Sequence, residues 1–210
     1  MELYRRLLWA GCFLLPMGTL AADFDAATAF GARESVADLH LSPDGQTVAY
    51  LSPMKGQGSM LYSLSPKEGS SPRAVLSVSG KEERLEGCGW VSNDRLVCTL
   101  SGYLTTAEQR SYFTRKVAID ADGKNPKILS DRVDPLSFGP VNTFGGSVIA
   151  RLPESASVLM ARVTVADEHV GTRLGSSREG LRVDRVDTRS ASATTVDAPQ
   201  SLGGGLYRRQ

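Results

Sequence analysis

The chain has 210 residues, of which 41% are hydrophobic and 22% are charged, and its formal net charge at pH 7 is +1. This composition is typical of a globular protein and excludes the charged, weakly hydrophobic class of disordered chains. Lys and Arg are scattered along the chain, so neither nucleic acid nor an anionic membrane surface is an expected partner.

The N-terminal residues indicate an export signal. Arg5 and Arg6 form a basic region, residues 7–15 are apolar, and small residues precede a cleavage point that we place after Ala21. One alternative is a membrane anchor, for which the apolar run is too short. Another is a lipoprotein site before Cys12, where Trp9 replaces the usual aliphatic residue. We therefore predict a signal peptide over residues 1–21, a periplasmic or secreted product, and no membrane association after signal removal.

The stretch that follows predicts a short lead-in and then a β-hairpin. Residues 22–34 are Ala-rich and fit a short helix or coil. The next turn is Ser42-Pro43-Asp44-Gly45. Pro43 presets φ, Asp44 can bind backbone amides, and Gly45 can adopt a positive φ. These residues therefore form a structural turn between strands predicted over residues 36–41 and 47–51.

The two strands of this hairpin differ in their patterns. In the first, Leu39 and Leu41 alternate with Asp38 and His40, so one face is predicted to be apolar. The second, residues 48–51, is apolar on both faces, which favours a strand covered by neighbouring sheets on both sides.

Strand-like runs recur in groups of four along the chain. The first group is residues 36–41, 47–51, 60–64 and 74–78; the second is 85–91, 96–100, 112–119 and 127–129; the third, looser group is 147–152, 158–165, 181–186 and 194–196. Equivalent hairpins are about fifty residues apart, which is typical of propeller blades. We predict an all-β fold, a partial β-propeller of about three four-stranded antiparallel blades within residues 35–200. The blades are placed at about 35–79, 84–130 and 144–198, before a disordered tail over 201–210.

Three stretches of the sequence resemble a known family: residues 35–50 (Ser-Val-Ala-Asp-Leu-His-Leu-Ser-Pro-Asp-Gly-Gln-Thr-Val-Ala-Tyr), a strand centred on Trp90, and residues 93–97 (Asn-Asp-Arg-Leu-Val). Together they resemble the N-terminal propeller of secreted bacterial serine peptidases of the prolyl oligopeptidase family, in the dipeptidyl or acylaminoacyl peptidase branch. The resemblance implies a propeller that caps an α/β-hydrolase domain and filters peptides by size, while a C-terminal domain cuts them. TolB-type propellers share the hairpin, so a non-enzymatic, protein-binding scaffold is the alternative.

The residues needed for hydrolysis are missing from the sequence. A hydrolase of this kind needs a Gly-x-Ser-x-Gly nucleophile elbow, and the chain contains none. Its only histidines are His40, expected to be solvated or loosely paired on a strand, and His169, in a polar loop. We predict no catalytic residue, no metal site and no cofactor in this chain. Peptide substrates are then implied only for a full-length relative.

Three blades leave open edges in a fold that is closed by repetition, so the chain is expected to stop before the rest of its propeller. A frameshift or early stop would explain this, and the alternatives are a short fragment paired with a partner chain or a separate small all-β protein. A partner chain that completes the propeller is therefore a further expectation.

Cys88 and Cys98 flank the turn at residues 92–94. With a three-residue loop, Cys88 faces Cys98 and Trp90 faces Leu96, and directly opposite residues suit a disulfide. An oxidising compartment would preserve this bond. A two-residue loop would send the sulfurs to opposite faces, and two reduced, packed cysteines are the alternative. We predict a Cys88–Cys98 disulfide, and a core role for Trp90 between neighbouring blades.

Overall fold

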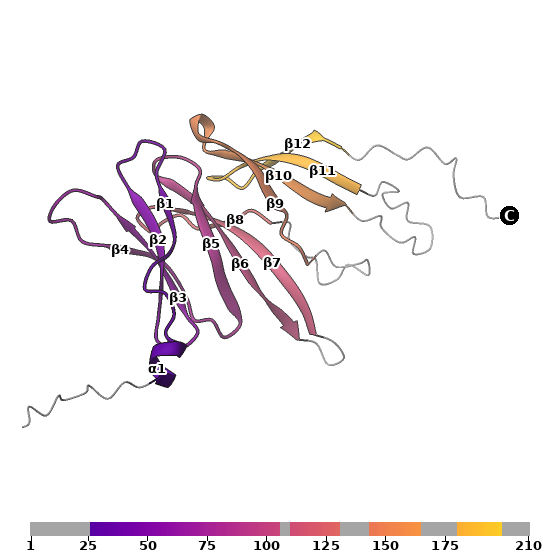
Figure 1. Ribbon diagram of the computed structural model, residues 1–210. Coiled ribbons are helices and arrows are strands. Elements are labelled where there is room, and N and C mark those ends of the chain that lie inside the picture. The colour runs from indigo at the N-terminus through magenta and orange to yellow at the C-terminus, as the bar shows by residue number, and fades with distance from the viewer. Residues whose placement is uncertain (1–25, 106–109, 131–142, 165–179, 199–210) are drawn as a thin grey trace, which may run out of the picture. The chain divides into compact units, whose positions relative to one another are not determined.

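The computed structural model describes residues 26–105, 110–130, 143–164 and 180–198 (Figure 1). The predicted signal peptide, the predicted tail and His169 lie outside the described residues. The chain divides into two units, residues 1–33 and 34–210. The described part of the first unit contains the short helix α1 (Ala26–Gly31), within the predicted lead-in. Among the described residues, no helix has the length and apolar character needed to cross a membrane.

The described part of the second unit forms three antiparallel four-stranded sheets, in each of which consecutive strands pair as a meander. The first sheet consists of β1 (Ala37–Leu41), β2 (Val48–Pro53), β3 (Ser59–Leu64) and β4 (Arg73–Val78); the second of β5 (Glu83–Trp90), β6 (Arg95–Thr105), β7 (Arg110–Asp120) and β8 (Lys127–Ile128); the third of β9 (Ser147–Leu152), β10 (Ser157–Thr164), β11 (Gly180–Asp187) and β12 (Ala193–Asp197). A single 3₁₀ turn, η1 (Pro153–Ser155), joins β9 to β10. The prediction of an all-β fold with strands grouped in fours is therefore confirmed.

The first hairpin turn is held by its own side chains. The Ser42 amide donates to the Thr47 carbonyl at 2.8 Å, and the Thr47 amide donates to Ser42 Oγ at 2.9 Å. Asp44 Oδ1 accepts from Ser42 Oγ at 2.6 Å and from the Gln46 amide at 3.0 Å. Gly45 has a φ of +70°, a conformation that glycine adopts without a Cβ clash. These contacts set the register between β1 and β2, because the turn determines which residues of the two strands pair.

The second hairpin has the register that places its cysteines opposite each other. Cys88 pairs with Cys98, and Trp90 pairs with Leu96. The Val91 amide donates to the Arg95 carbonyl at 2.8 Å and closes the turn. The structure contains a Cys88–Cys98 disulfide, whose residues are separated by 10 positions in the sequence.

Two apolar cores join the sheets face to face. The core between the first and second sheets contains Ala49, Leu51, Leu61, Val75, Leu85, Cys88, Trp90, Leu96, Cys98, Leu100, Val117 and Ile119. The core between the second and third sheets contains Val91, Val97, Ala118, Leu129, Val158, Met160 and Val186. Because successive side chains of a strand point to opposite faces, β6 contributes Leu96 and Cys98 to one core and Val97 to the other. The second sheet is therefore covered on both faces.

The face of the first sheet that points away from the second sheet is less buried than the sequence predicts. In β2, Ala49 and Leu51 are buried, but Val48 and Tyr50 are only half-buried, so the strand is not covered equally on both sides. In β1, Leu39 and Leu41 are 60% and 57% exposed. The physical reason is position in the stack, since this sheet has a described neighbour, the second sheet, on only one of its faces.

The strict alternation predicted for β1 is also broken. Asp38 has a φ of +49°, which is unusual for a residue with a side chain, and the pairing of β1 with β2 shifts between Ala37 and His40. An irregularity of this kind bends a strand and redirects its side chains, as in a β-bulge. The Asp38 carboxylate is thereby turned toward the second sheet, where it meets β5.

Candidate functional site

The turns of the three sheets line a shallow groove. Its volume is about 720 Å³. The lining residues come from the hairpins that follow β1, β5, β9 and β11, namely Pro43, Asp44, Ser92, Asn93, Asp94, Pro153, Glu154, Ser155, Ala156 and Arg189. Two of the predicted turn residues, Pro43 and Asp44, therefore lie in its wall, and we call it the turn groove.

An ion pair crosses the turn groove between the second and third sheets. Arg189 Nη2 lies 2.7 Å from Asp94 Oδ2 and 3.0 Å from Asp94 Oδ1, while Ser92 Oγ donates to Asp94 Oδ1 at 2.7 Å. Hydrogen bonds from Arg189 and then from Ser92 hold the pKa of Asp94 below its ordinary value. Both partners are largely exposed, so the pair orients the two turns more than it stabilises the fold.

A second polar contact links the first two turns. The Asp44 amide donates to Asn93 Oδ1 at 3.1 Å. The Ser42 hydroxyl, followed by the Gln46 amide, lowers the pKa of Asp44, so this carboxylate is ionised at neutral pH. With Glu154, the groove has three carboxylates against the single guanidinium of Arg189 among its lining side chains. Its electrostatic character favours a cationic group over an anionic one.

Arg95 is a buried residue behind this groove that sequence reasoning did not identify. Its side chain is fully buried. Nη1 donates to Asp120 Oδ1 at 2.7 Å and to the Asn125 carbonyl at 2.8 Å, and Nη2 donates to the Thr188 carbonyl at 2.5 Å. Arg95 therefore ties the second sheet to the last turn of the third. The one sequence signal was an Arg placed directly after the Ser92–Asp94 turn.

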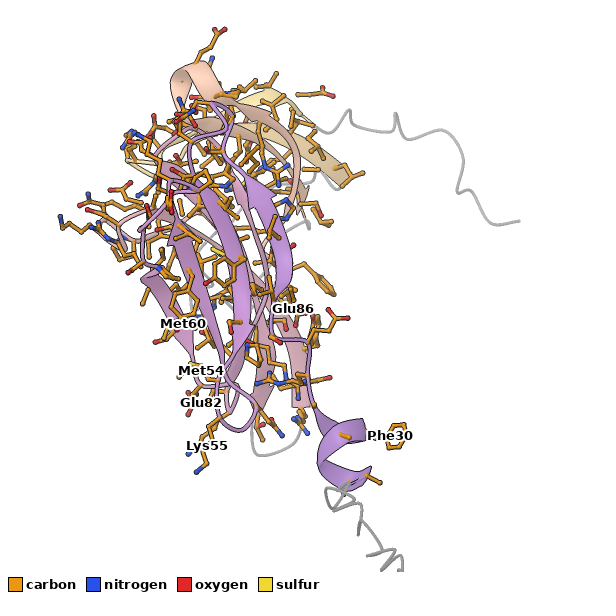
Figure 2. The ribbon with its side chains drawn as sticks, turned by 60° about the vertical axis from the view of Figure 1, so that its left-hand side comes forward. Phe30, Met54, Lys55, Met60, Glu82 and Glu86 are labelled. Carbon is orange, nitrogen blue, oxygen red and sulfur yellow. A yellow bond between two sulfur atoms is a disulfide. The ribbon has the colours of Figure 1, made fainter. Side chains whose placement is uncertain are left out.

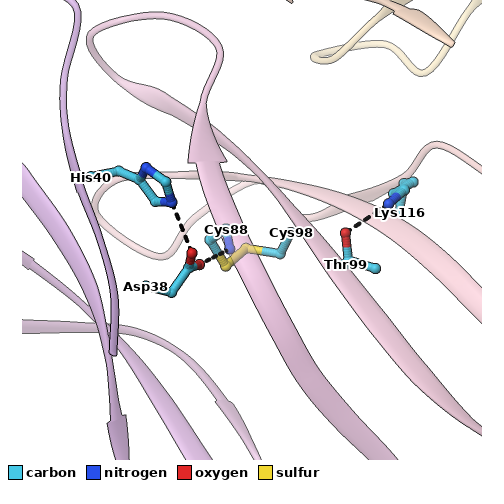
Figure 3. Close-up of a disulfide and its surroundings, with 6 residues drawn as sticks. All are labelled: Asp38, His40, Cys88, Cys98, Thr99 and Lys116. Atoms are coloured by element: carbon cyan, nitrogen blue, oxygen red, sulfur yellow. Dashed lines mark hydrogen bonds and ion pairs between the residues drawn. A yellow bond between two sulfur atoms is a disulfide. The ribbon is translucent and has the colours of Figure 1, made fainter. Parts of the chain in front are cut away.

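A second polar cluster surrounds the disulfide (Figure 3). Asp38 Oδ2 accepts from the Cys88 amide at 2.7 Å, and Asp38 Oδ1 lies 2.8 Å from His40 Nε2. The Trp90 indole donates to the His40 carbonyl at 3.0 Å. Because β5 is an edge strand, amides on its outer side have no strand partner, and Asp38 supplies one. The cluster joins β1 to β5 next to the first core.

This cluster does not have the arrangement of a catalytic dyad. The His40 ring is hydrogen-bonded to a carboxylate and to no described hydroxyl or thiol, and its side chain is 48% exposed. A nucleophile within hydrogen-bond reach is the geometric requirement for activation by a histidine base. Trp90 is 6% exposed and lies in the core between the first two sheets. Within the described part of the chain, no three His, Cys, Asp or Glu side chains are grouped as metal ligands.

Comparisons with known proteins show a similarity to a solved structure but no match to a family model or a curated sequence. No model of a known protein family matches the chain, and no curated protein matches it in sequence. Among solved structures, a puromycin-hydrolyzing peptidase of Mycobacterium tuberculosis is similar over 83% of this chain, with a TM-score of 0.39 and 13% sequence identity. The chain spans 30% of the length of that peptidase.

Proposed function

We propose that this chain is the propeller portion of an exported serine peptidase of the prolyl oligopeptidase family, which controls access of peptides and contains no catalytic residues of its own. The observation that carries the proposal is the repetition of one unit. The same four-stranded meander occurs three times, and the units join through apolar sheet faces. A Ser-x-Asp turn with the same hydroxyl–carboxylate bond occurs in the first two units, at Ser42–Asp44 and Ser92–Asp94.

Contacts at the first strand of each sheet support a radial arrangement. From β1, the Asp38 carboxylate reaches the Cys88 amide of β5 at 2.7 Å. From β9, the Arg151 guanidinium lies so close to Gly89 of β5 that an added Cβ would stand 2.5 Å from Nη2. In a propeller the first strands of the blades lie around a central channel. The contacts that β1 and β9 make with β5 are of the kind this geometry requires.

Paired spin labels test the radial arrangement. One doubly labelled variant carries cysteines at Leu39 and Ile149, on the first strands of the first and third sheets, and the control carries them at Ser77 and Thr194, on outer strands. A propeller predicts a clearly shorter distance for the first pair than for the control pair in pulsed electron paramagnetic resonance. Equal distances would indicate a parallel stack and would contradict the propeller.

The absence of catalysis has its own test. We expect the purified chain to leave peptide nitroanilides intact and to resist labelling by serine-directed fluorophosphonate probes. Labelling, followed by identification of the modified serine, would show that the chain has a nucleophile and would overturn the proposed division between gating and catalysis.

Export to the periplasm or the exterior is part of the proposal. The Cys88–Cys98 disulfide supports it, because such bonds persist in oxidising compartments. N-terminal sequencing of the exported product is expected to begin at Ala22. A product that stays inside the cell with its first residues intact would contradict this step.

A non-enzymatic protein-binding scaffold of TolB type is the second candidate. The turn groove favours it, because residues from turns of all three sheets line one surface with an excess of carboxylates. Fluorescence anisotropy with labelled oligolysine and oligoglutamate peptides separates the candidates. Binding of oligolysine that is lost in Asp94→Asn would support the scaffold. Absence of binding by both peptides would contradict the scaffold and favour the gating role.

A further inference from the structure

We propose that a second copy of this chain packs its first sheet against the third sheet of the first copy, and that the reciprocal contact closes a ring of six sheets. This inference rests on the proposed propeller arrangement and names the partner that completes it. It follows from two mainly apolar sheet faces that no described sheet covers, which we call open, and from an interface that the chain already forms twice.

The first open face belongs to the first sheet. Cross-strand pairing places Val48 opposite Leu64, Tyr50 opposite Tyr62 and Ser52 opposite Met60, so these six side chains share one face. All six are half-buried, and Met60 is labelled in Figure 2. The Tyr50 and Tyr62 rings stack with their centroids 5.5 Å apart. These pairs contain no charged side chain, so this partly accessible face is suited to pack against another sheet.

The second open face belongs to the third sheet. Pairing places Leu159 opposite Arg185, Ala161 opposite Val183 and Val163 opposite Leu181, on the side that points away from the core shared with the second sheet. Leu181 is 68% exposed. Apart from Arg185, these side chains are apolar, so this face is also suited to cover another sheet.

The two open faces are the two halves of an interface that recurs inside the chain. Each hairpin closes on one residue pair: Ser42–Thr47, Val91–Arg95 and Leu152–Ser157. The residue that follows each pair is Val48 of β2, Leu96 of β6 and Val158 of β10, so these three residues correspond. Leu96 packs against the preceding sheet and Val158 does the same, whereas Val48 has no preceding sheet among the described elements. The first sheet therefore exposes the face that a preceding sheet covers in the other two.

The neighbouring residues show the opposite half. Ala49 of β2 and Val97 of β6 each pack against the sheet that follows. Their counterpart in β10 is Leu159, which lies on the open face of the third sheet. One chain thus carries both complementary surfaces of a head-to-tail contact, and such contacts form a closed ring when the rotation between units allows it.

A second copy fits these faces better than an unrelated partner would. Three sheets from each of two copies give six, within the usual range of 4 to 8 blades, and leave no sheet face open. Arg185 on one face also suits the stacked tyrosines on the other, since a guanidinium packs favourably over an aromatic ring. The two-fold symmetry uses the head-to-tail contact twice.

Sedimentation velocity of the exported chain, with its disulfide intact, tests the proposal. We expect a dimer at micromolar concentration. Tyr62→Arg on the first sheet and Leu181→Arg on the third should each raise the apparent Kd about 30-fold or more, as replacement of a central interface residue does. The matched control is Ile128→Arg, an exposed aliphatic residue of the second sheet (55% exposed), which should leave the dimer unchanged.

A mixture of the two variants gives a signature that a head-to-tail contact produces and a contact between two identical faces does not, while the wild-type sedimentation separates a closed ring from an open series. A heterodimer of the Tyr62→Arg and Leu181→Arg chains has one contact with no substitution and one with both, so dimers should partly return on mixing. Circular dichroism and the urea midpoint of each variant show that the monomers are folded. A wild-type monomer, an open series of larger assemblies, or dissociation by only one of the two substitutions would overturn the proposal.

The two spin-labelled pairs described above distinguish failure of the dimer proposal from failure of the propeller proposal. A shorter distance between the first strands in a chain that sediments as a monomer would support the propeller and contradict the dimer. Equal distances in the two labelled pairs would remove both.

Discussion

Replacement of Arg95 by Met tests whether one buried guanidinium holds the second and third sheets together. The side chain is fully buried and donates to the Asp120 carboxylate and to the carbonyls of Asn125 and Thr188. Met keeps most of the volume but leaves these three acceptors without their donor. Breaking a buried ion pair from one side costs about 3–5 kcal/mol. Asp120 retains the Asn125 amide at 2.7 Å, so we expect the lower end, about 3 kcal/mol.

Urea unfolding followed by tryptophan fluorescence, without reductant, measures this loss. With a slope of about 1–3 kcal/mol/M, the midpoint should fall by about 1–3 M. Arg84→Met is the matched control, because Arg84 is exposed on β5, and its effect should stay within about 0.5 kcal/mol. In a double-mutant cycle, Asp120→Asn should cost much less in the Arg95→Met background than in the wild type. A loss below about 1 kcal/mol for Arg95→Met, or additive single effects, would refute the reasoning.

Three further predictions concern the disulfide, a close-packed glycine and the groove ion pair. Reducing the Cys88–Cys98 bond should lower the free energy of unfolding by about 2–3 kcal/mol, from the entropy of the loop that it closes, in urea titrations with and without reductant. Gly102→Ala should lower it by about 1–3 kcal/mol, because the new Cβ would stand 2.5 Å from a backbone carbonyl oxygen that cannot yield as a flexible side chain does; a urea midpoint equal to wild type would contradict this. The Arg189 guanidinium lowers the pKa of Asp94, so the pair contributes stability above the ordinary value of 3.8 and loses it as the pH falls through the lower folded-state pKa. In Arg189→Gln, carboxyl ¹³C NMR should show the pKa of Asp94 moving up toward 3.8, and an unchanged value would show that the pair does not form in solution.

The strands and their pairing were predictable because they depend on neighbours in the sequence. Pro43 and Gly45 have the backbone preferences of a turn, and period-two patterns mark the strands on either side. The same local logic placed Cys88 opposite Cys98, since the length of the intervening turn determines the register. The polar groove was not predictable in this way, because its side chains come from four different turns.

By itself, the sequence determined the all-β class, the grouping of strands in fours and the facing cysteines, since turn chemistry and alternation act over a few residues. Only the tertiary structure decided that Arg95 is buried and that Leu39 and Leu41 are exposed. A sequence pattern records which residues are apolar, but burial depends on which sheet covers which face. Asp38 shows the same limit, because its carboxylate accepts a hydrogen bond from the Cys88 amide of an edge strand fifty residues away.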